Sequence, residues 1–139
     1  MLRKLFSYFI PINIHKKNSP VSKTLEVTWN NGELVLDSKN TNYSYGSLQR
    51  ILRKGLKYIG FERIRNFETV LVLGVAGGSV IKTLVDEIKC KAEIIGVEID
   101  ESVIDLANHY FELNKIPNCS IIIDDAFEYV LKTKATYDL

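Results

Sequence analysis

The sequence has 139 residues, 46% of them hydrophobic and 25% charged, with a mean hydropathy of +0.00 and a formal net charge of +1. These values are typical of one ordinary globular domain and exclude a disordered or fibrous chain. No apolar run reaches the roughly 18 residues that a membrane span needs, and the two cysteines, Cys90 and Cys119, lack metal-ligand spacing. We therefore expect a reduced, cytoplasmic protein with neither a disulfide nor a metal site.

The N-terminal residues 1–17, MLRKLFSYFIPINIHKK, combine apolar and basic side chains. A signal peptide is disfavoured because Ser7 and Pro11 interrupt the apolar run and no small-residue cleavage site follows. We expect a short helix that packs on the domain or on a dimer partner, and contact with a membrane surface is the open alternative.

Residues 23–38 predict a β-hairpin. Apolar and polar side chains alternate on either side of Asn30-Asn31-Gly32, and Asn and Gly suit turn positions with positive φ. The polar residues 39–44 are expected to form a loop. This part of the chain, residues 1–44, is predicted to be an N-terminal arm with a β-hairpin element.

The core is predicted to comprise residues 45–139. It begins with apolar residues at helical spacing over 45–59 (Leu48, Ile51, Leu52, Leu56, Ile59), a pattern that stops at Gly60. The basic region 48–65 is interpreted as a solvated helix face, because no aromatic or motif context indicates a nucleic-acid module.

Strands and helices then alternate to the end of the sequence. The predicted elements are strand 69–74, helix 79–88, strand 92–99, helix 101–114, strand 120–124, helix 126–133 and the start of a strand at 137–139. Near-continuous apolar strands separated by amphipathic helices indicate an α/β fold with a doubly wound, mainly parallel Rossmann-like sheet. Open sheets of this class normally have more strands, so we expect the sheet to be incomplete at its C-terminal end.

Three segments follow the carboxyl ends of the three predicted strands, where such sheets bind ligands. They are the loop Gly74-Val75-Ala76-Gly77-Gly78, then Glu98, then Asp125-Ala126. Small loop residues let a ligand approach the backbone, a carboxylate after the second strand can accept both ribose hydroxyls, and a carboxylate with a neighbouring N–H after the third can contact adenine. From Glu98 onward nine acidic residues face three lysines, which favours a cationic ligand.

A nicotinamide dinucleotide fits this loop poorly. The dinucleotide motif G-x-G-x-x-G would place its glycines at Gly74, Ala76 and Ser79, and two of these are absent. The loop therefore favours an adenosine ligand without a diphosphate, and a nicotinamide oxidoreductase is disfavoured.

The segments VLVLGVAGGSV, IIGVEIDESVIDLANHYFEL and SIIIDDAFEYVLKTKATYDL closely resemble the spermidine synthases and the class I S-adenosylmethionine-dependent methyltransferases to which they belong structurally. The resemblance extends over about residues 24–139 and includes NYSYGSLQRIL. It implies a cofactor, S-adenosylmethionine (AdoMet) or decarboxylated AdoMet, and a homodimeric assembly. It places Gly74 to Gly78 at the methionine portion, Glu98 and the adjoining Ile99 at the ribose, and Asp125 with Ala126 at the adenine. Tyr45 is expected to face the reaction centre and the substrate.

Two departures from spermidine synthases bear on the reaction. Their glycine loop carries an Asp that holds the aminopropyl amine, where this chain has Gly77, and their acidic pair after the fourth core strand would lie beyond Leu139. Aminopropyl transfer needs carboxylates to hold a polycation and take up its proton, whereas an activated methyl group needs chiefly alignment. We therefore favour a methyltransferase acting on a small-molecule acceptor, with no catalytic residue assigned. An aminopropyltransferase of polyamine biosynthesis and a non-catalytic nucleotide-binding or dimerisation module stay open.

Several polar residues have plainer interpretations. Asp100 and Glu101 are predicted to cap the following helix, and Asp125 can cap a helix as well as contact a ligand. His15 and His109 are expected to have surface or packing roles.

Overall fold

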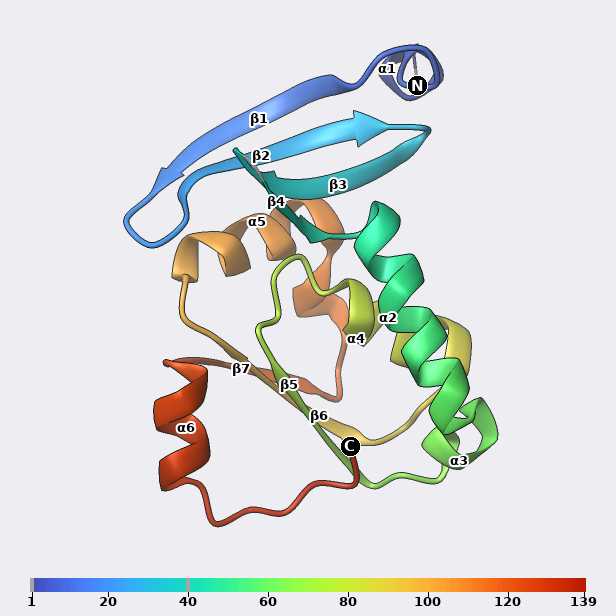
Figure 1. The fold of residues 1–139 in the computed structure, drawn as a ribbon, viewed down its shortest axis with the longest axis vertical. Coiled ribbons are helices and arrows are strands. Elements are labelled where there is room, and N and C mark those ends of the chain that lie inside the picture. Colours follow the sequence, from blue (N-terminus) through green and yellow to red (C-terminus); the bar gives the residue numbers. More distant parts are fainter. Residues whose placement is uncertain (1, 40) are drawn as a thin grey trace.

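The computed structural model describes residues 2–39 and 41–139 and contains two sheets, one above the other (Figure 1). The elements of the N-terminal part are α1 (Leu2–Phe6), β1 (Ile12–Ser19), β2 (Lys23–Asn30), β3 (Glu33–Ser38) and β4 (Thr41–Ser44). Those of the core are α2 (Gly46–Ile59), α3 (Phe61–Arg65), β5 (Thr69–Leu73), α4 (Ser79–Lys82), the π-helical η1 (Thr83–Ile88), β6 (Glu93–Glu98), α5 (Glu101–Phe111), the 3₁₀ turn η2 (Leu113–Lys115), β7 (Cys119–Ile123) and α6 (Ala126–Lys132).

The N-terminal sheet is antiparallel, in the order β1-β2-β3-β4. The predicted hairpin is confirmed: Asn30 pairs with Glu33, and the two turn residues Asn31 and Gly32 have φ of 50° and 77°. Both positive angles are those of a type I′ turn, whose twist matches that of the strands.

The prediction of a loop over residues 39–44 is wrong for Thr41 to Ser44, which form β4, while Asn40 lies outside the described residues. Pairing with β3 makes this polar segment a strand, and the Asn42 side-chain amide donates across the pair to Asp37 Oδ1 at 2.6 Å. The short helix predicted at the N-terminus is present as α1. It is anchored on the hairpin turn, because the Ser7 hydroxyl accepts a hydrogen bond from the Gly32 N–H at 2.9 Å.

The core sheet is parallel, in the order β5-β6-β7, as predicted. On the other side of β5, the Asp138 N–H donates to Thr69 O at 3.0 Å and the Leu71 N–H donates to Leu139 O at 2.8 Å. No strand is assigned to residues 137–139, yet these two bonds place the chain end alongside β5 (Figure 1). The chain thus adds β6 and β7 on one side of β5 and then returns to the other side of β5. This reversal of strand order is typical of a doubly wound sheet, and such sheets bind their ligands where the order reverses.

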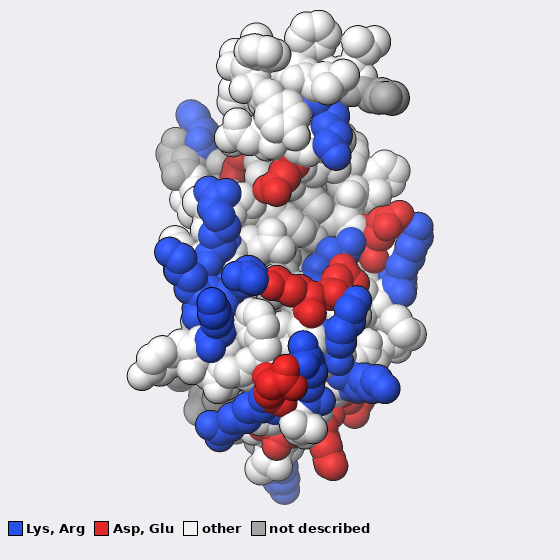
Figure 2. Space-filling view, turned by 90° about the vertical axis from the view of Figure 1, so that its right-hand side faces the viewer, with Lys and Arg blue, Asp and Glu red and all other residues white. Residues whose placement is uncertain are grey.

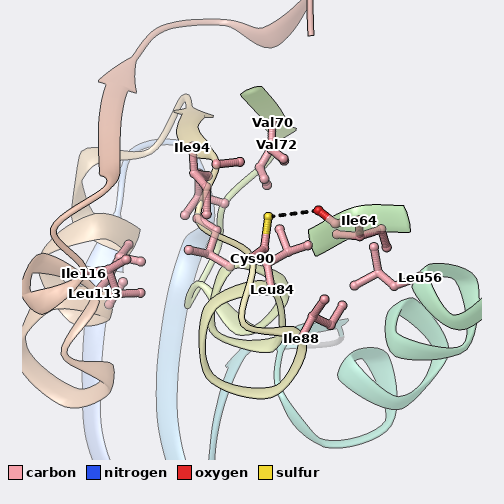
Figure 3. Packing of buried hydrophobic residues seen from close by; sticks show 14 of the residues in the cluster. Leu56, Ile64, Val70, Val72, Leu84, Ile88, Cys90, Ile94, Leu113 and Ile116 are labelled. Atoms are coloured by element: carbon pink, nitrogen blue, oxygen red, sulfur yellow. Dashed lines mark hydrogen bonds between the residues drawn. The ribbon is translucent and has the colours of Figure 1, made fainter. Parts of the chain in front are cut away.

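The main core lies between the parallel sheet and the helices on its flank (Figure 3). It includes Ile64 of α3, Val70 of β5, Ile88 of η1 and Ile94 of β6, none of them more than 1% exposed. The Cys90 thiol lies among them and donates to Ile64 O at 3.3 Å. Both cysteines are free.

A second apolar cluster joins the two sheets. Leu25, Val27 and Leu36 of the N-terminal sheet pack against Val103, Leu106 and Phe111 of α5. Because α5 begins just after β6, this cluster fixes the N-terminal sheet over the carboxyl edge of the core sheet.

Two helices differ in detail from their predictions. The apolar stripe of α2 is largely uncovered: only Leu56 is buried, and Ile51 is 65% exposed. The helix predicted over 79–88 starts as α4 and widens into η1, where the Thr83 hydroxyl donates to Ser79 O at 2.9 Å. Within the described ranges no helix has the length and apolar character that crossing a membrane requires.

Candidate functional site

The residues predicted to form a site meet at one edge of the core sheet. The Gly74 N–H donates to Val97 O at 2.9 Å, and the Asp124 N–H donates to Glu98 O at 3.1 Å. These bonds continue the ladders beyond the strands, so the glycine loop, the end of β6 and the start of α6 lie side by side.

The glycine loop turns sharply after β5, with φ of 80° at Gly74, 50° at Ala76 and 80° at Gly78. A side chain at Gly74 would meet nothing within 4 Å, so the space above it is open. A Cβ at Gly78 would lie 2.8 Å from Leu113 Cδ1. The loop thus presents Gly74 and the half-buried Ala76 to solvent, while Gly78 and the side chain of Val75 face the core.

Glu98 holds this loop. Its Oε2 accepts a hydrogen bond from the Ala76 N–H at 3.0 Å, and its Oε1 accepts one from the Asp100 N–H at 3.1 Å. Each carboxylate oxygen has a further lone pair, and the side chain is half-buried. Glu98 can therefore support the loop and still accept hydrogen bonds from a ligand.

Asp100 ties the N-terminal hairpin to the same edge. Its Oδ1 accepts from the Ser102 N–H at 3.0 Å and so caps α5, as predicted, and its Oδ2 accepts from the hydroxyls of Ser19 and Ser22 at 2.5 Å each. Asp100 is 2% exposed. Burial alone would raise the pKa of its carboxyl, but the hydrogen bonds from Ser19, Ser22 and Ser102 outweigh this and lower it.

Gly77 packs against the junction between the two parts of the chain. A Cβ at this position would lie 2.9 Å from Ser44 Cβ, 3.1 Å from Ser44 Oγ and 3.1 Å from Tyr45 Cε2. The Ser44 hydroxyl accepts from the Ser79 N–H at 3.2 Å, and the Tyr45 hydroxyl donates to Gly77 O at 3.0 Å. Ser44 and Tyr45 thus fill the space that a side chain at position 77 would need.

Tyr45 itself is fixed by packing. Its ring stacks on Phe111 with centroids 4.5 Å apart, and its backbone has φ of 69°. Burial, with the negative charge of Asp86 as a second cause, raises the pKa of its hydroxyl well above the ordinary value. Tyr45 is therefore a neutral hydrogen-bond donor that supports the loop.

Asp125 caps α6: its Oδ1 accepts from the N–H groups of Phe127 and Glu128 at 2.8 and 3.0 Å. Among residues 2–39 and 41–139 no hydrogen-bond partner is found for the Ala126 N–H or for Asp125 Oδ2. A donor and an acceptor are therefore left at the start of α6.

Apolar side chains at the ends of the three strands are partly exposed. Ile99, which follows β6, is 49% exposed, and Leu73 and Ile123 at the ends of β5 and β7 are 48% and 46% exposed. The register places Leu73 level with Val97 and Ile122, and Ile123 level with Glu98, so Leu73 and Ile123 point to opposite faces of the sheet. Ile99 is the apolar side chain that directly follows Glu98 in the chain.

Sequence reasoning missed the serines of this site. Ser19 and Ser22 lie 81 and 78 residues before Asp100, and each reads in the sequence as an ordinary turn residue.

His15 and His109 pack against Tyr110, with ring centroids at 5.4 and 4.6 Å. In the part of the chain that the structure describes, no group of three or more His, Cys, Asp or Glu side chains is placed to hold a metal ion.

Comparisons with known proteins identify a family and a shared fold. The sequence profile described as "Spermine/spermidine synthase domain" matches residues 49–139. No curated protein matches the chain significantly.

Solved structures share the fold. The spermidine synthase of Thermotoga maritima superposes with a TM-score of 0.72 at 20% identity, over 91% of this chain and 46% of that one. A probable spermidine synthase of Corynebacterium glutamicum gives 0.63 at 14% identity, over 86% and 46%. Human methyltransferase-like protein 13, in complex with SAH, gives 0.55 at 24% identity, over 68% and 46%. The chain thus spans just under half the length of each structure.

Proposed function

The chain belongs to the spermine/spermidine synthase domain family, and from this membership we propose that it is an AdoMet-dependent transferase that moves a methyl group to a small-molecule acceptor. The observation that carries the choice of cofactor is the meeting of the glycine loop, Glu98 and the start of α6 at one sheet edge, tied by the hydrogen bond from the Ala76 N–H to Glu98. The solved structure of human methyltransferase-like protein 13 contains SAH, and a spermidine synthase of the same fold contains the transition-state analogue AdoDATO.

The described residues suit the parts of AdoMet. The free lone pairs of Glu98 are available to the ribose hydroxyls. The Ala126 N–H and Asp125 Oδ2, for which the described residues offer no hydrogen-bond partner, are available to the adenine edge. Ile99 offers an exposed apolar surface to the adenosine. The open space above Gly74 leaves room for the methionine portion.

When bound, the cofactor supplies an activated methyl group on a sulfonium. The chain then has to hold the donor in one orientation and admit an acceptor in line with it, which contributes much of the rate without an acid or base. Tyr45 fits this role as a neutral group that fixes the loop through Gly77 O.

Gly77 supports methyl transfer over aminopropyl transfer. In the spermidine synthases that this loop resembles, an Asp at this position holds the aminopropyl amine, and here Ser44 and Tyr45 occupy the space that such a side chain would need. A bare aminopropyl ammonium would therefore lack its counter-charge in the loop, whereas AdoMet carries its own carboxylate beside its amine.

Aminopropyl transfer is the second candidate. It is supported by the family itself and by the names of the two spermidine synthases whose folds match. The two candidates differ in the cofactor they prefer, which makes them separable by binding alone.

A titration of AdoMet into the protein by calorimetry tests the cofactor site. We expect saturable binding, and Glu98→Gln should weaken it roughly 10- to 100-fold, because a hydrogen bond to a charged group contributes about 1.5–3 kcal/mol. Glu93→Gln is the matched control, since Glu93 is exposed at the opposite end of the same strand. Absence of binding at millimolar AdoMet, or equal affinity of the Glu98 and Glu93 variants, would contradict the proposal.

We also propose a domain division, a homodimer and a cellular location for the protein. The hydrogen bond from the Ser79 N–H to the Ser44 hydroxyl supports treating residues 1–44 as an element that positions the core, residues 45–139. The exposed side chains of Leu5, Phe6 and Phe9 support a homodimer formed through the N-terminal arm, which light scattering can test. Two free thiols support a reducing, cytoplasmic location.

A further inference from the structure

The outer face of α2 is basic. Residues 38–61 contain no Asp or Glu, and Figure 2 shows Lys and Arg side chains gathered on the side of the molecule along which α2 runs. Arg50, Lys54 and Lys57, which we call the basic stripe, are all exposed. Within residues 2–39 and 41–139 no ion pair is found for any of the three. The basic stripe therefore presents three cations to solvent.

Helix geometry puts Tyr58 on the same face as the basic stripe. With about 3.6 residues per turn, the four side chains lie within about 100° of one another around the axis, over a length of about 12 Å. The opposite face packs on the core, where the Gln49 side-chain amide donates to Thr83 Oγ1 at 3.2 Å and Leu56 is buried. α2 thus uses one face for packing and leaves the other uncovered.

Tyr58 gives the basic stripe an aromatic neighbour. Its side chain is 95% exposed, which the sequence does not reveal, because apolar spacing alone does not tell an outward tyrosine from a packed one. Arg53 marks the edge of this face, since its Nε lies 2.7 Å from Glu87 Oε1 and its guanidinium lies over the Phe61 ring. An exposed aromatic ring beside unengaged cations is typical of surfaces that bind single-stranded nucleic acids, whose bases stack while their phosphates meet the cations.

A membrane surface suits this face less well. A helix that lies in the lipid interface buries an apolar face and keeps its cations on the polar side. On α2 the basic stripe stands at the centre of the outer face, and the exposed Ile51 lies about 100° around the axis from Arg50. The charge pattern therefore favours contact with phosphates over insertion into lipid.

We propose that the basic stripe and Tyr58 form a docking surface for a single-stranded nucleic acid. Its phosphates contact Arg50, Lys54 and Lys57, and one of its bases stacks on Tyr58. Contacts with the phosphate backbone supply affinity without regard to base sequence, and stacking on an aromatic ring tolerates every base. The surface does not involve the glycine loop or Glu98, so this proposal is independent of the proposed reaction.

Fluorescence anisotropy with fluorescein-labelled oligouridine and oligothymidine of about 12 nucleotides tests this surface. We expect saturable binding of both with similar affinity, because phosphates and base faces are common to RNA and DNA. Between about 50 and 200 mM NaCl, the logarithm of the binding constant should fall against the logarithm of the salt concentration with a slope of about −2. This slope corresponds to three phosphate contacts at about 0.7 each.

Variants separate the cations from the aromatic ring. Lys54→Gln/Lys57→Gln should reduce the salt slope to about −0.7. Lys132→Gln/Lys134→Gln, an equal change of charge at exposed positions in and after α6, is the matched control and should leave the slope unchanged. Tyr58→Ala should weaken oligouridine binding about fivefold or more, from the loss of one stacked base. Its binding to heparin, a polyanion without bases, should be unchanged.

Four results would overturn the proposal. They are the absence of saturable binding, an unchanged salt slope in Lys54→Gln/Lys57→Gln, an equal effect of Tyr58→Ala on oligouridine and heparin, and tighter binding to vesicles than to oligouridine. The vesicles contain equal parts of phosphatidylcholine and phosphatidylserine, and their binding is measured by co-sedimentation. The substituted side chains are exposed, so the variants are expected to fold, and circular dichroism verifies that.

Discussion

Replacing Gly77 by Ala tests whether the junction at Ser44 and Tyr45 leaves any space for a side chain. The new Cβ would lie 2.9 Å from Ser44 Cβ and 3.1 Å from both Ser44 Oγ and Tyr45 Cε2. None of these atoms is the free end of a flexible chain: Ser44 is 1% exposed, and the Tyr45 ring is held against Phe111. Ser44 or Tyr45 must therefore shift to admit the new methyl group.

The expected cost has two parts. Overpacking a rigid site by one methyl group costs about 1–3 kcal/mol, and displacing Tyr45 strains its hydrogen bond to Gly77 O, worth about 0.5–1.5 kcal/mol. Together these lower the free energy of unfolding by roughly 2–4 kcal/mol, which corresponds to a fall in Tm of about 6 to 16 °C for a chain of this length.

Thermal unfolding followed by circular dichroism measures this fall, and Gly55→Ala is the matched control. Gly55 lies inside α2 with nothing within 4 Å of its would-be Cβ, so the same change there should stabilise the helix by about 0.5–1 kcal/mol. Combining Gly77→Ala with Ser44→Gly should recover part of the loss, because the nearest clash is removed. An unchanged Tm in Gly77→Ala, or a double variant that is strictly additive, would refute the account of this junction.

Further predictions concern the titratable groups. The lowered pKa of Asp100 in the folded state contributes stability above the ordinary aspartate pKa of about 3.9, and this contribution is lost as the pH falls through the lowered value. Urea titration measures the difference in unfolding free energy between the protein and Asp100→Asn. This difference should be constant from pH 5 to 8 and shrink below about pH 4. A difference that does not vary with pH would contradict a charged Asp100. Burial raises the pKa of the Cys119 thiol to about 11, so native protein should react slowly with a thiol reagent at pH 8, and both cysteines rapidly after denaturation. Rapid labelling of the native protein would show that Cys119 is not protected.

Much of the fold follows from local patterns in the sequence. The strands at β5, β6 and β7 are apolar runs that end in turn residues, and the Asn31-Gly32 turn has the residue types that its φ angles demand. The positions of Glu98 and Asp125 at strand ends follow from the order of these elements, since parallel strands end at one edge.

The contacts that assemble the site do not follow from such patterns. The hydrogen bonds from Ser19 and Ser22 to Asp100 join residues about eighty positions apart, and nothing in the local sequence distinguishes these serines from others in turns. β4 is a strand only because β3 is available to pair with it. From the sequence, Gly77 is notable only because spermidine synthases have an Asp at this position. The structure explains why a glycine stands there, since Ser44 and Tyr45 lie too close for a side chain.

Competition between AdoMet and decarboxylated AdoMet for the same protein tests the central claim most directly. The two cofactors differ only in the carboxylate beside the amine, and the loop has Gly77 in place of a side chain that could neutralise a bare ammonium. We predict that AdoMet binds more tightly, by about threefold or more, the effect of one ion pair, and that this preference is kept in Glu93→Gln. Equal or tighter binding of decarboxylated AdoMet would contradict a methyltransferase and assign the chain to aminopropyl transfer.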